Sequence, residues 1–258
     1  MADPFESSRR KIARANHHAL DLAKRIDSFL KENPCERIIE AHPERADQFV
    51  HKIKFRRSIN EPFNELLGDA AYNLRAALDH ACYGVALSAG VIKPINAYFP
   101  FAIDSTDLER VMKGRSRDLP QEILPLFRAL QPYKGGNIPL WTLNQIRNRD
   151  NHALLIPVVI IAEDISSKLN STARSLVSMP LTHVWDGTKQ EIEVATFRAN
   201  GEFDYEIDVT VSVVFEEIEG INGIGGKSPI PFLDTAGHVV EDILRRIEGE
   251  ARRLGFVN

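Results

Sequence analysis

Residues 60–88 read NEPFNELLGDAAYNLRAALDHACYGVALS and predict one long amphipathic helix. Asn60 is a typical N-cap, and Pro62 fits the first turn because a backbone N–H has no helical partner there. Gly90 is a typical helix stop. The apolar face repeats at helical spacing and consists of Phe63, Leu67, Ala70, Leu74, Ala77, Leu78, Ala81 and Val85.

The segments around this helix predict an α+β fold, in which a helical bundle carries an antiparallel β-sheet inserted before the C-terminal helix. Further helices are expected at about residues 4–33, 105–113, 120–130, 137–151 and 230–254. The last of these helices needs an apolar partner, and the N-terminal helix is the simplest one. Residues 35–58 alternate and predict a short hairpin, whereas residues 154–219 are rich in β-branched side chains and predict the sheet, with turns at 185–187 and 200–201.

We therefore expect a helical part over residues 1–153 that includes the hairpin, a sheet over 154–219 and a returning helix within 220–258, together forming one compact domain. The chain has 258 residues, of which 43% are hydrophobic and 26% charged, as in ordinary globular proteins. This composition excludes disordered, collagen-like and disulfide-scaffold classes. No apolar run reaches a membrane span or a signal-peptide core, so a cytoplasmic protein without membrane contact is expected.

Charge and cysteine usage add weaker indications. Residues 1–153 carry a net charge of +4 and residues 154–219 a net charge of −8, which mildly fits a polyanionic partner for the first part. The basic segments SSRRKIAR and HKIKFRRS are expected to be solvated faces, with RNA contact as the sharper alternative. Cys35 and Cys82 fit a reducing compartment and cannot form a metal cluster alone; Cys82 is expected to serve packing.

Residues 137–152, NIPLWTLNQIRNRDNH, are the most informative for chemistry. The predicted helix is apolar almost all round and should be buried, yet Asn144, Arg147 and Asn151 lie within its apolar surface. A buried guanidinium needs a carboxylate, a backbone partner or a wet cavity. Asp79 or Asp69 on the preceding long helix is the expected partner of Arg147.

The same segment fits the pattern Arg-Asn-x-x-x-His, because Arg147 and Asn148 are followed by His152. This pattern resembles the signature of HEPN domains, which are helical bundles. The resemblance implies a metal-independent endoribonuclease or RNA-binding protein with no cofactor, usually a homodimer with two motifs facing each other. In that case His152 transfers the proton of the RNA 2′-hydroxyl, Arg147 neutralises the phosphate charge, and Asn148 orients the histidine or the ribose.

A second resemblance covers more of the chain. Together, LGDAAYNLRAALDHACY and LNQIRNRDNHALL resemble a set of uncharacterised bacterial proteins with an Asn-x-Arg-x-Ala-Leu-Asp-His helix and an Asn-x-Asp-Lys-His-Arg stretch. The second stretch departs from that pattern because Asn151 replaces Lys and Ala153 replaces Arg, and the resemblance implies no activity. The matching polar residues are Asn73, Arg75, Asp79, His80, Asn148, Asp150 and His152.

Arg75 and His80 also form an Arg-x4-His pair, but on a continuous helix two residues five apart are separated by about 140°. We therefore expect them to leave on opposite flanks and to have no joint role.

Two alternatives to RNA chemistry remain open. In the first, the protein is a non-catalytic interaction protein in which Arg147 and His152 are buried structural ties. In the second, a metal-dependent enzyme uses histidines and aspartates on facing helices. Its ligands would come from His18, His80, His152, Asp69, Asp79 and Asp150, whereas His17 and His238 are expected in solvent.

A glycine-rich segment, Gly223-Ile-Gly225-Gly226-Lys227-Ser228, resembles a phosphate-binding loop. The P-loop pattern needs a glycine at position 221, which is Ile221 in this chain. A loop that leads into the last helix is the expectation there.

Overall fold

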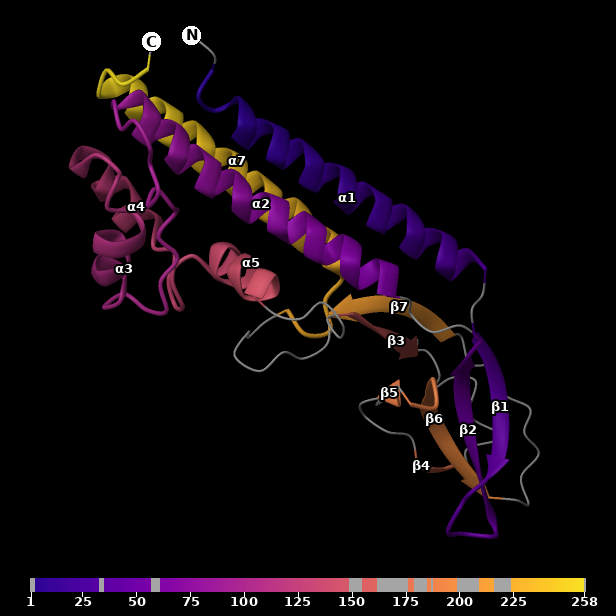
Figure 1. Cartoon of the computed structure of the whole chain (residues 1–258). Helices are drawn as coiled ribbons and strands as arrows, with labels where there is room; N and C mark the ends of the chain where they lie inside the picture. Colours follow the sequence, from indigo (N-terminus) through magenta and orange to yellow (C-terminus); the bar gives the residue numbers. More distant parts are fainter. Residues whose placement is uncertain are drawn as a thin grey trace. The chain divides into compact units, whose positions relative to one another are not determined.

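The computed structural model describes residues 3–32, 35–56, 61–148, 155–161, 176–178, 185–186, 188–198, 209–215 and 224–257. The fold is α+β, as the sequence predicts (Figure 1). The chain divides into two compact units, each built from separate stretches of sequence. The first comprises Met1–Ala23, Asn64–His152 and Pro229–Asn258, and the second comprises Lys24–Phe63 and Ala153–Ser228.

Helices make up the first unit. The long ones are α1 (Glu6–Lys31), which continues into the second unit, α2 (Glu61–Ser88) and α7 (Pro229–Arg253). Shorter helices are α3 (Leu108–Arg115), α4 (Leu124–Leu130) and α5 (Ile138–Asn148), with a 3₁₀ turn, η1 (Gln121–Ile123), before α4. Every predicted helix has a counterpart at nearly the predicted place. No helix among the described residues is long and apolar enough to cross a membrane.

The three long helices lie side by side in the first unit (Figure 1). Near the start of α1, Ser7 Oγ lies 2.6 Å from His80 Nδ1 of α2, and Arg9 pairs with Glu248 of α7. One turn further along, Lys11 Nζ donates to Asn73 Oδ1 at 3.2 Å. From the first contact to the next, the residue number rises from 7 to 11 on α1 and falls from 80 to 73 on α2, so the two helices run antiparallel. The contact with Glu248 near the end of α7 confirms the predicted pairing of the first and last helices.

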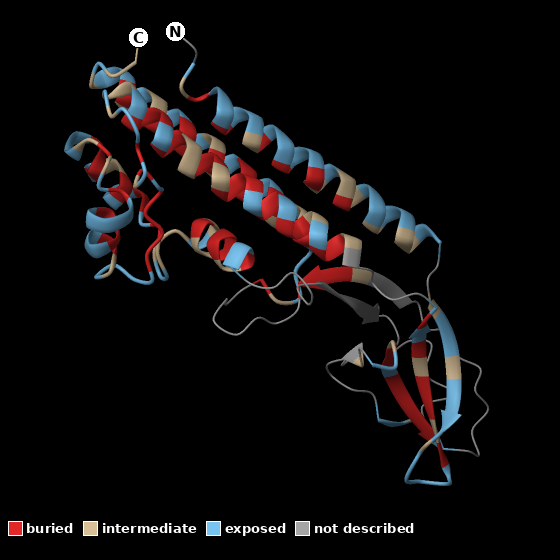
Figure 2. Ribbon diagram, viewed as in Figure 1, coloured by how far each residue is buried: buried red, intermediate tan, exposed pale blue. Residues whose placement is uncertain are grey.

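The predicted apolar face of α2 is buried along its whole length (Figure 2). Helix α7 buries a face of its own that includes Ala236, Val240, Ile243, Leu244, Ile247 and Ala251. Helix α2 ends where glycine was expected. Gly90 has φ +90° and its N–H bonds to Leu87 O at 3.0 Å, while Val91 N–H bonds to Ala86 O at 3.0 Å. Glycine adopts this left-handed conformation without steric cost, which closes the helix.

The second unit holds the strands, and those that pair do so antiparallel. One sheet has the order β1 (Cys35–Ala41), β2 (Gln48–Phe55), β6 (Glu191–Arg198), β4 (Leu176–Ser178), and β5 (Trp185–Asp186) pairs with β6. Strands β3 (Leu155–Ile161) and β7 (Val209–Phe215) form a separate pair.

The sheet topology differs from the sequence analysis in two respects. The hairpin over residues 35–58 was grouped with the helices, whereas β2 pairs with β6 and so joins the later sheet. Trp185 and Asp186 are strand residues, and the turn follows them at residues 188–190. The predicted turn at 200–201 lies outside the described residues.

The close approach of α2 to the N-terminal segment gives a first prediction. A Cβ atom added at Gly84 would lie 2.5 Å from the carbonyl oxygen of Pro4, whereas one added at Gly249 of α7 meets no atom within 4 Å. We expect Gly84→Ala to lower the free energy of unfolding by about 1–3 kcal/mol. The control Gly249→Ala should raise it by about 0.5–1 kcal/mol, because alanine is the better helix former. Urea denaturation measures both, and equal stabilisation by the two changes would contradict the packing described here.

Candidate functional site

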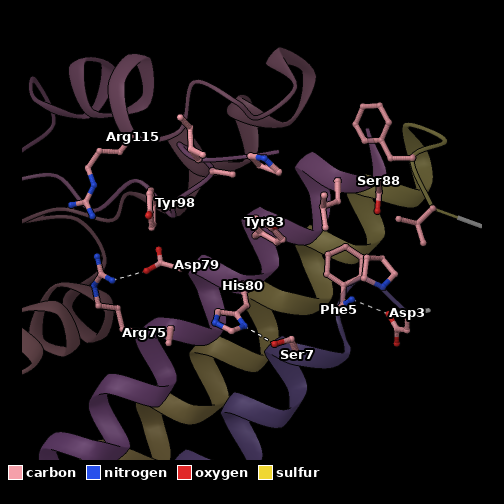
Figure 3. A pocket seen from close by; sticks show the side chains of 18 of the residues that line it. Asp3, Phe5, Ser7, Arg75, Asp79, His80, Tyr83, Ser88, Tyr98 and Arg115 are labelled. Carbon is pink, nitrogen blue, oxygen red and sulfur yellow. Dashed lines mark hydrogen bonds and ion pairs between the residues drawn. The ribbon is translucent and has the colours of Figure 1, made fainter. Parts of the chain in front are cut away.

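A large cavity, with a volume of about 1480 Å³, lies in the first unit (Figure 3). Helix α2 supplies one wall, the end of α3 and the segment before it supply another, and the two termini of the chain close a third side. Its functional side chains from α2 are Tyr72, Arg75, Asp79, His80 and Tyr83, and those from elsewhere are Asp3, Ser7, Tyr98, Arg115, Arg147 and Arg252.

Arg75 is the buried cation of this site, with a side chain only 9% exposed. Its Nη1 lies 2.7 Å from Asp79 Oδ2 one turn further along α2, and its Nε donates to Asn144 Oδ1 of α5 at 3.1 Å. The guanidinium also lies over the Phe101 ring, 5.1 Å from its centre. Asp79 Oδ1 in turn accepts the backbone N–H of Phe99 at 3.0 Å. These contacts tie α2 to α5 and to the segment at residues 99–101.

This arrangement corrects the prediction for Arg147. Arg147 is exposed in the last turn of α5, where its Nη1 donates to the side chain of neighbouring Asn148 at 3.0 Å. Asp79, one of its two expected partners, pairs with Arg75 instead, and no described contact joins Arg147 to Asp69. The prediction of a helix buried all round was therefore wrong at its ends. Asn144 is buried, as predicted.

Positive charge dominates the lining of the cavity. Four arginines line it, and its two carboxylates are already paired, Asp79 with Arg75 and Asp3 with Arg9. Burial lowers the pKa of Arg75, Asp79 opposes that shift, and the positive charges of Arg147 and Arg115 lower it further. Since these guanidinium groups lie close enough to repel one another, an anion bound between them would be stabilised.

His80 reaches the same cavity from the other flank of α2. Its Nδ1 contacts Ser7 of α1, whereas Arg75 contacts α5, so the two side chains point to different helices as their spacing predicts (Figure 3). The predicted opposite flanks are therefore confirmed, although both residues line the same cavity. Burial lowers the pKa of His80, and the charge of Lys11 lowers it further. The imidazole is therefore neutral at neutral pH and able to take up a proton.

Sequence reasoning found part of this site. Asn144, Arg147, Asn148, Asn73, Arg75, Asp79 and His80 are described, and all but Asn73 line this cavity or a smaller one beside the same arginines. Asp150, Asn151 and His152 lie outside the described residues, so the Arg-Asn-x-x-x-His pattern is seen only in its first two members. Reasoning from the sequence missed Arg115 and Tyr98. Their ring-to-guanidinium contact, 5.3 Å, joins α3 to the segment before it, and no local pattern indicates that contact.

The metal alternative receives no support from the part of the chain that the structure describes. Within it, no three histidine, cysteine or acidic side chains are placed to hold a metal ion. His17 and His238 are exposed, as predicted, and His18 is buried in the core side of α1. Cys82 is fully buried and desolvation raises its pKa well above the usual value, which fits its predicted packing role.

Comparison of the chain with family models, curated proteins and solved structures finds no match. The geometry and charge of the cavity are therefore the basis for a proposal about function.

The different environments of two arginines give a second prediction. Arg75→Met leaves Asp79 without its cation and Asn144 without its donor, and should lower the free energy of unfolding by about 2–3 kcal/mol. The matched change Arg147→Met should alter it by less than about 0.5 kcal/mol, because that side chain is exposed and its hydrogen bond among the described residues is to neighbouring Asn148. Thermal and urea unfolding measure both. A large loss of stability in Arg147→Met would restore the view that Arg147 is a structural tie.

Proposed function

We propose that this protein binds single-stranded RNA in the large cavity of its first unit. The observation that carries the proposal is the set of arginines, Arg75, Arg115 and Arg147, which line one cavity together with tyrosine side chains. The resemblance of Arg147 and Asn148 to the start of the HEPN signature favours RNA over other polyanions.

The size of the cavity favours an extended ligand. Its volume of about 1480 Å³ exceeds the roughly 300–1,000 Å³ that is typical for small molecules. Tyr72 and Tyr83 stand on the same face of α2, eleven residues and hence about 16 Å apart. Such a separation suits a ligand of several repeating units better than one compact molecule.

The chemistry of the lining favours nucleic acid. Tyr72 is 50% exposed, Tyr83 45% and Tyr98 41%. A cation already lies over the Tyr72 and Tyr98 rings, so base stacking there uses the opposite ring face, whereas no cation is described over the Tyr83 ring. Base stacking on aromatic side chains contributes about 1–3 kcal/mol per base without regard to sequence. Arginines bind the phosphate groups, and these two features together are what single-stranded nucleic acid requires. The cavity is positive although the whole chain carries a formal net charge of −4.

The binding proposal is tested with a fluorescent single-stranded RNA at several salt concentrations. Arg115→Gln and Arg147→Gln should each weaken binding and reduce the slope of log affinity against log salt by about 1, because each removes one phosphate contact. Arg10→Gln is the control, since Arg10 is exposed on α1, is paired with Glu6 and does not line the cavity. RNA binding that is unchanged in both cavity variants, or equally weakened in the control, would contradict the proposal.

Cleavage of the bound RNA is a second candidate function, and the placement of two motif residues favours it. Arg147 and Asn148 are both exposed at the end of α5, and both line the smaller cavity that Arg115 also lines. An arginine fork there can stabilise the charge that develops on phosphorus when the 2′-hydroxyl attacks. The proton must then be removed by a base, the role that the resemblance gives to His152, and returned to the leaving 5′-oxygen.

The cleavage proposal is tested by incubating the protein with RNA in EDTA, which removes divalent metal ions. We expect cleavage in the wild type and its loss by at least about 100-fold in Arg147→Ala and in His152→Ala, with thermal stability unchanged. Asn137→Ala, a change at the opposite end of α5, controls for disturbance of that helix. Absence of cleavage in the wild type, or full activity in His152→Ala, would leave RNA binding as the function.

One element of the non-catalytic alternative, a buried arginine that acts as a structural tie, fits Arg75. The buried contacts of Arg75 with Asp79 and Asn144 are those of a structural tie, and they belong to Arg75 instead of Arg147. Arg75 therefore acts through the position of α5, whereas Arg115 and Arg147 act on the ligand.

A further inference from the structure

A smaller cavity of about 380 Å³ shares Arg75, Arg115 and Arg147 with the large one. The segment at residues 101–103, α3 and α5 supply its other walls. Its volume is at the lower end of the range for small ligands, so it suits one compact group and not a length of strand. Because both cavities include the same three arginines, a ligand in the large cavity can extend a terminal group into the small one.

The charges of the small cavity match a dianion. Arg75 is paired with Asp79, and Arg110 is paired with Asp107 at 2.6 Å. Asp107 is the one carboxylate in the described lining, and its Oδ2 also accepts the N–H of Ile103. Among the described residues, Arg115 and Arg147 have no carboxylate partner. Two uncompensated positive charges fit a phosphate monoester, which carries about −1.5 to −2 at pH 7, better than an internal phosphodiester with one charge.

A second observation also points to an acceptor from outside the chain. Trp141 of α5 lines this cavity, and its buried Nε1–H has no acceptor among the described residues. Buried polar groups are nearly always hydrogen-bonded, so this donor calls for an acceptor from outside the described residues. Phosphate oxygens are such acceptors.

From these observations we infer that the small cavity binds the terminal phosphate monoester of an RNA strand. This inference rests on the proposed RNA binding, in which the strand lies along Tyr72 and Tyr83 and its end reaches Arg115 and Arg147. Inorganic phosphate and a free nucleoside monophosphate present the same chemical group, so the experiment must separate these sources from an RNA end.

The experiment compares three RNAs of one sequence, with a 5′-phosphate, with a 3′-phosphate and with hydroxyl groups at both ends, by fluorescence anisotropy. We expect at least one phosphorylated RNA to bind about tenfold more tightly than the hydroxyl form, since charge-assisted hydrogen bonds are the strong ones. Inorganic phosphate and adenosine monophosphate are added as competitors. They should remove this preference only at concentrations far above that of the RNA. Removal at concentrations close to that of the RNA would make a small phosphate compound the ligand and overturn the inference.

Gly114 offers a matched pair of variants that act on the small cavity alone. It lines that cavity but not the large one, and a Cβ added there meets no atom within 4 Å. Gly114→Glu places a carboxylate beside the arginines and should reduce the preference for a terminal phosphate to about twofold or less. Gly114→Gln has nearly the same size without the charge and should retain most of the preference.

Tyr83→Ala, in the large cavity, should weaken all three RNAs by the same factor and leave the preference intact. Equal binding of all three RNAs by the wild type, or a preference that survives Gly114→Glu, would overturn the inference while RNA binding stands. Absence of binding by every RNA would overturn the proposed function together with it.

Discussion

The burial of the Arg75 guanidinium is the constraint on which the rest of the site depends. A charge at that depth is tolerated only with partners, and Asp79 and Asn144 provide them. Because Asn144 belongs to α5, satisfying Arg75 fixes where α5 lies against α2. Arg147 stands one turn beyond Asn144, at the end of the same helix. The buried hydrogen bond between Arg75 and Asn144 thus holds the exposed end of α5 at the cavity.

The arginines of the cavity divide into two kinds, and the division follows from their ion pairs. Arg75 is already neutralised by Asp79, so removing it would disturb packing more than ligand affinity. Arg115 contacts the ring of Tyr98 and Arg147 the amide of Asn148, and neither contact cancels the charge. Each of them repels the Arg75 guanidinium, and an anion bound among the three relieves that repulsion. Charge that is uncompensated in the free protein is therefore the physical source of the proposed binding.

The sequence predicts the helices well because their apolar residues repeat at regular spacing, and in α2 every one of those residues is buried. The sequence does not predict burial or strand pairing correctly where these depend on contacts between distant segments. Ile138 and Arg147 at the ends of α5 are exposed, although the helix is apolar nearly all round and Leu140, Leu143 and Ile146 are buried. Likewise, the pairing of β2 with β6 joins segments about 140 residues apart, and alternation within a strand does not identify its partner.

The basic segments of the sequence show why the proposed binding site is not evident from local charge. In the run that begins at Ser7, Arg9 pairs with Asp3 and Glu248, and Arg10 pairs with Glu6, so nearby carboxylates neutralise both. Among the described residues, Lys11 of this run has no carboxylate partner, and neither do Arg115 and Arg147, which stand on different helices. Within the basic run, nearby carboxylates neutralise Arg9 and Arg10. Cations that the fold brings together from different helices remain available to a ligand when no carboxylate lies beside them. In this protein, the tertiary structure therefore determines which cations stand close together, and the proposed binding depends on that arrangement.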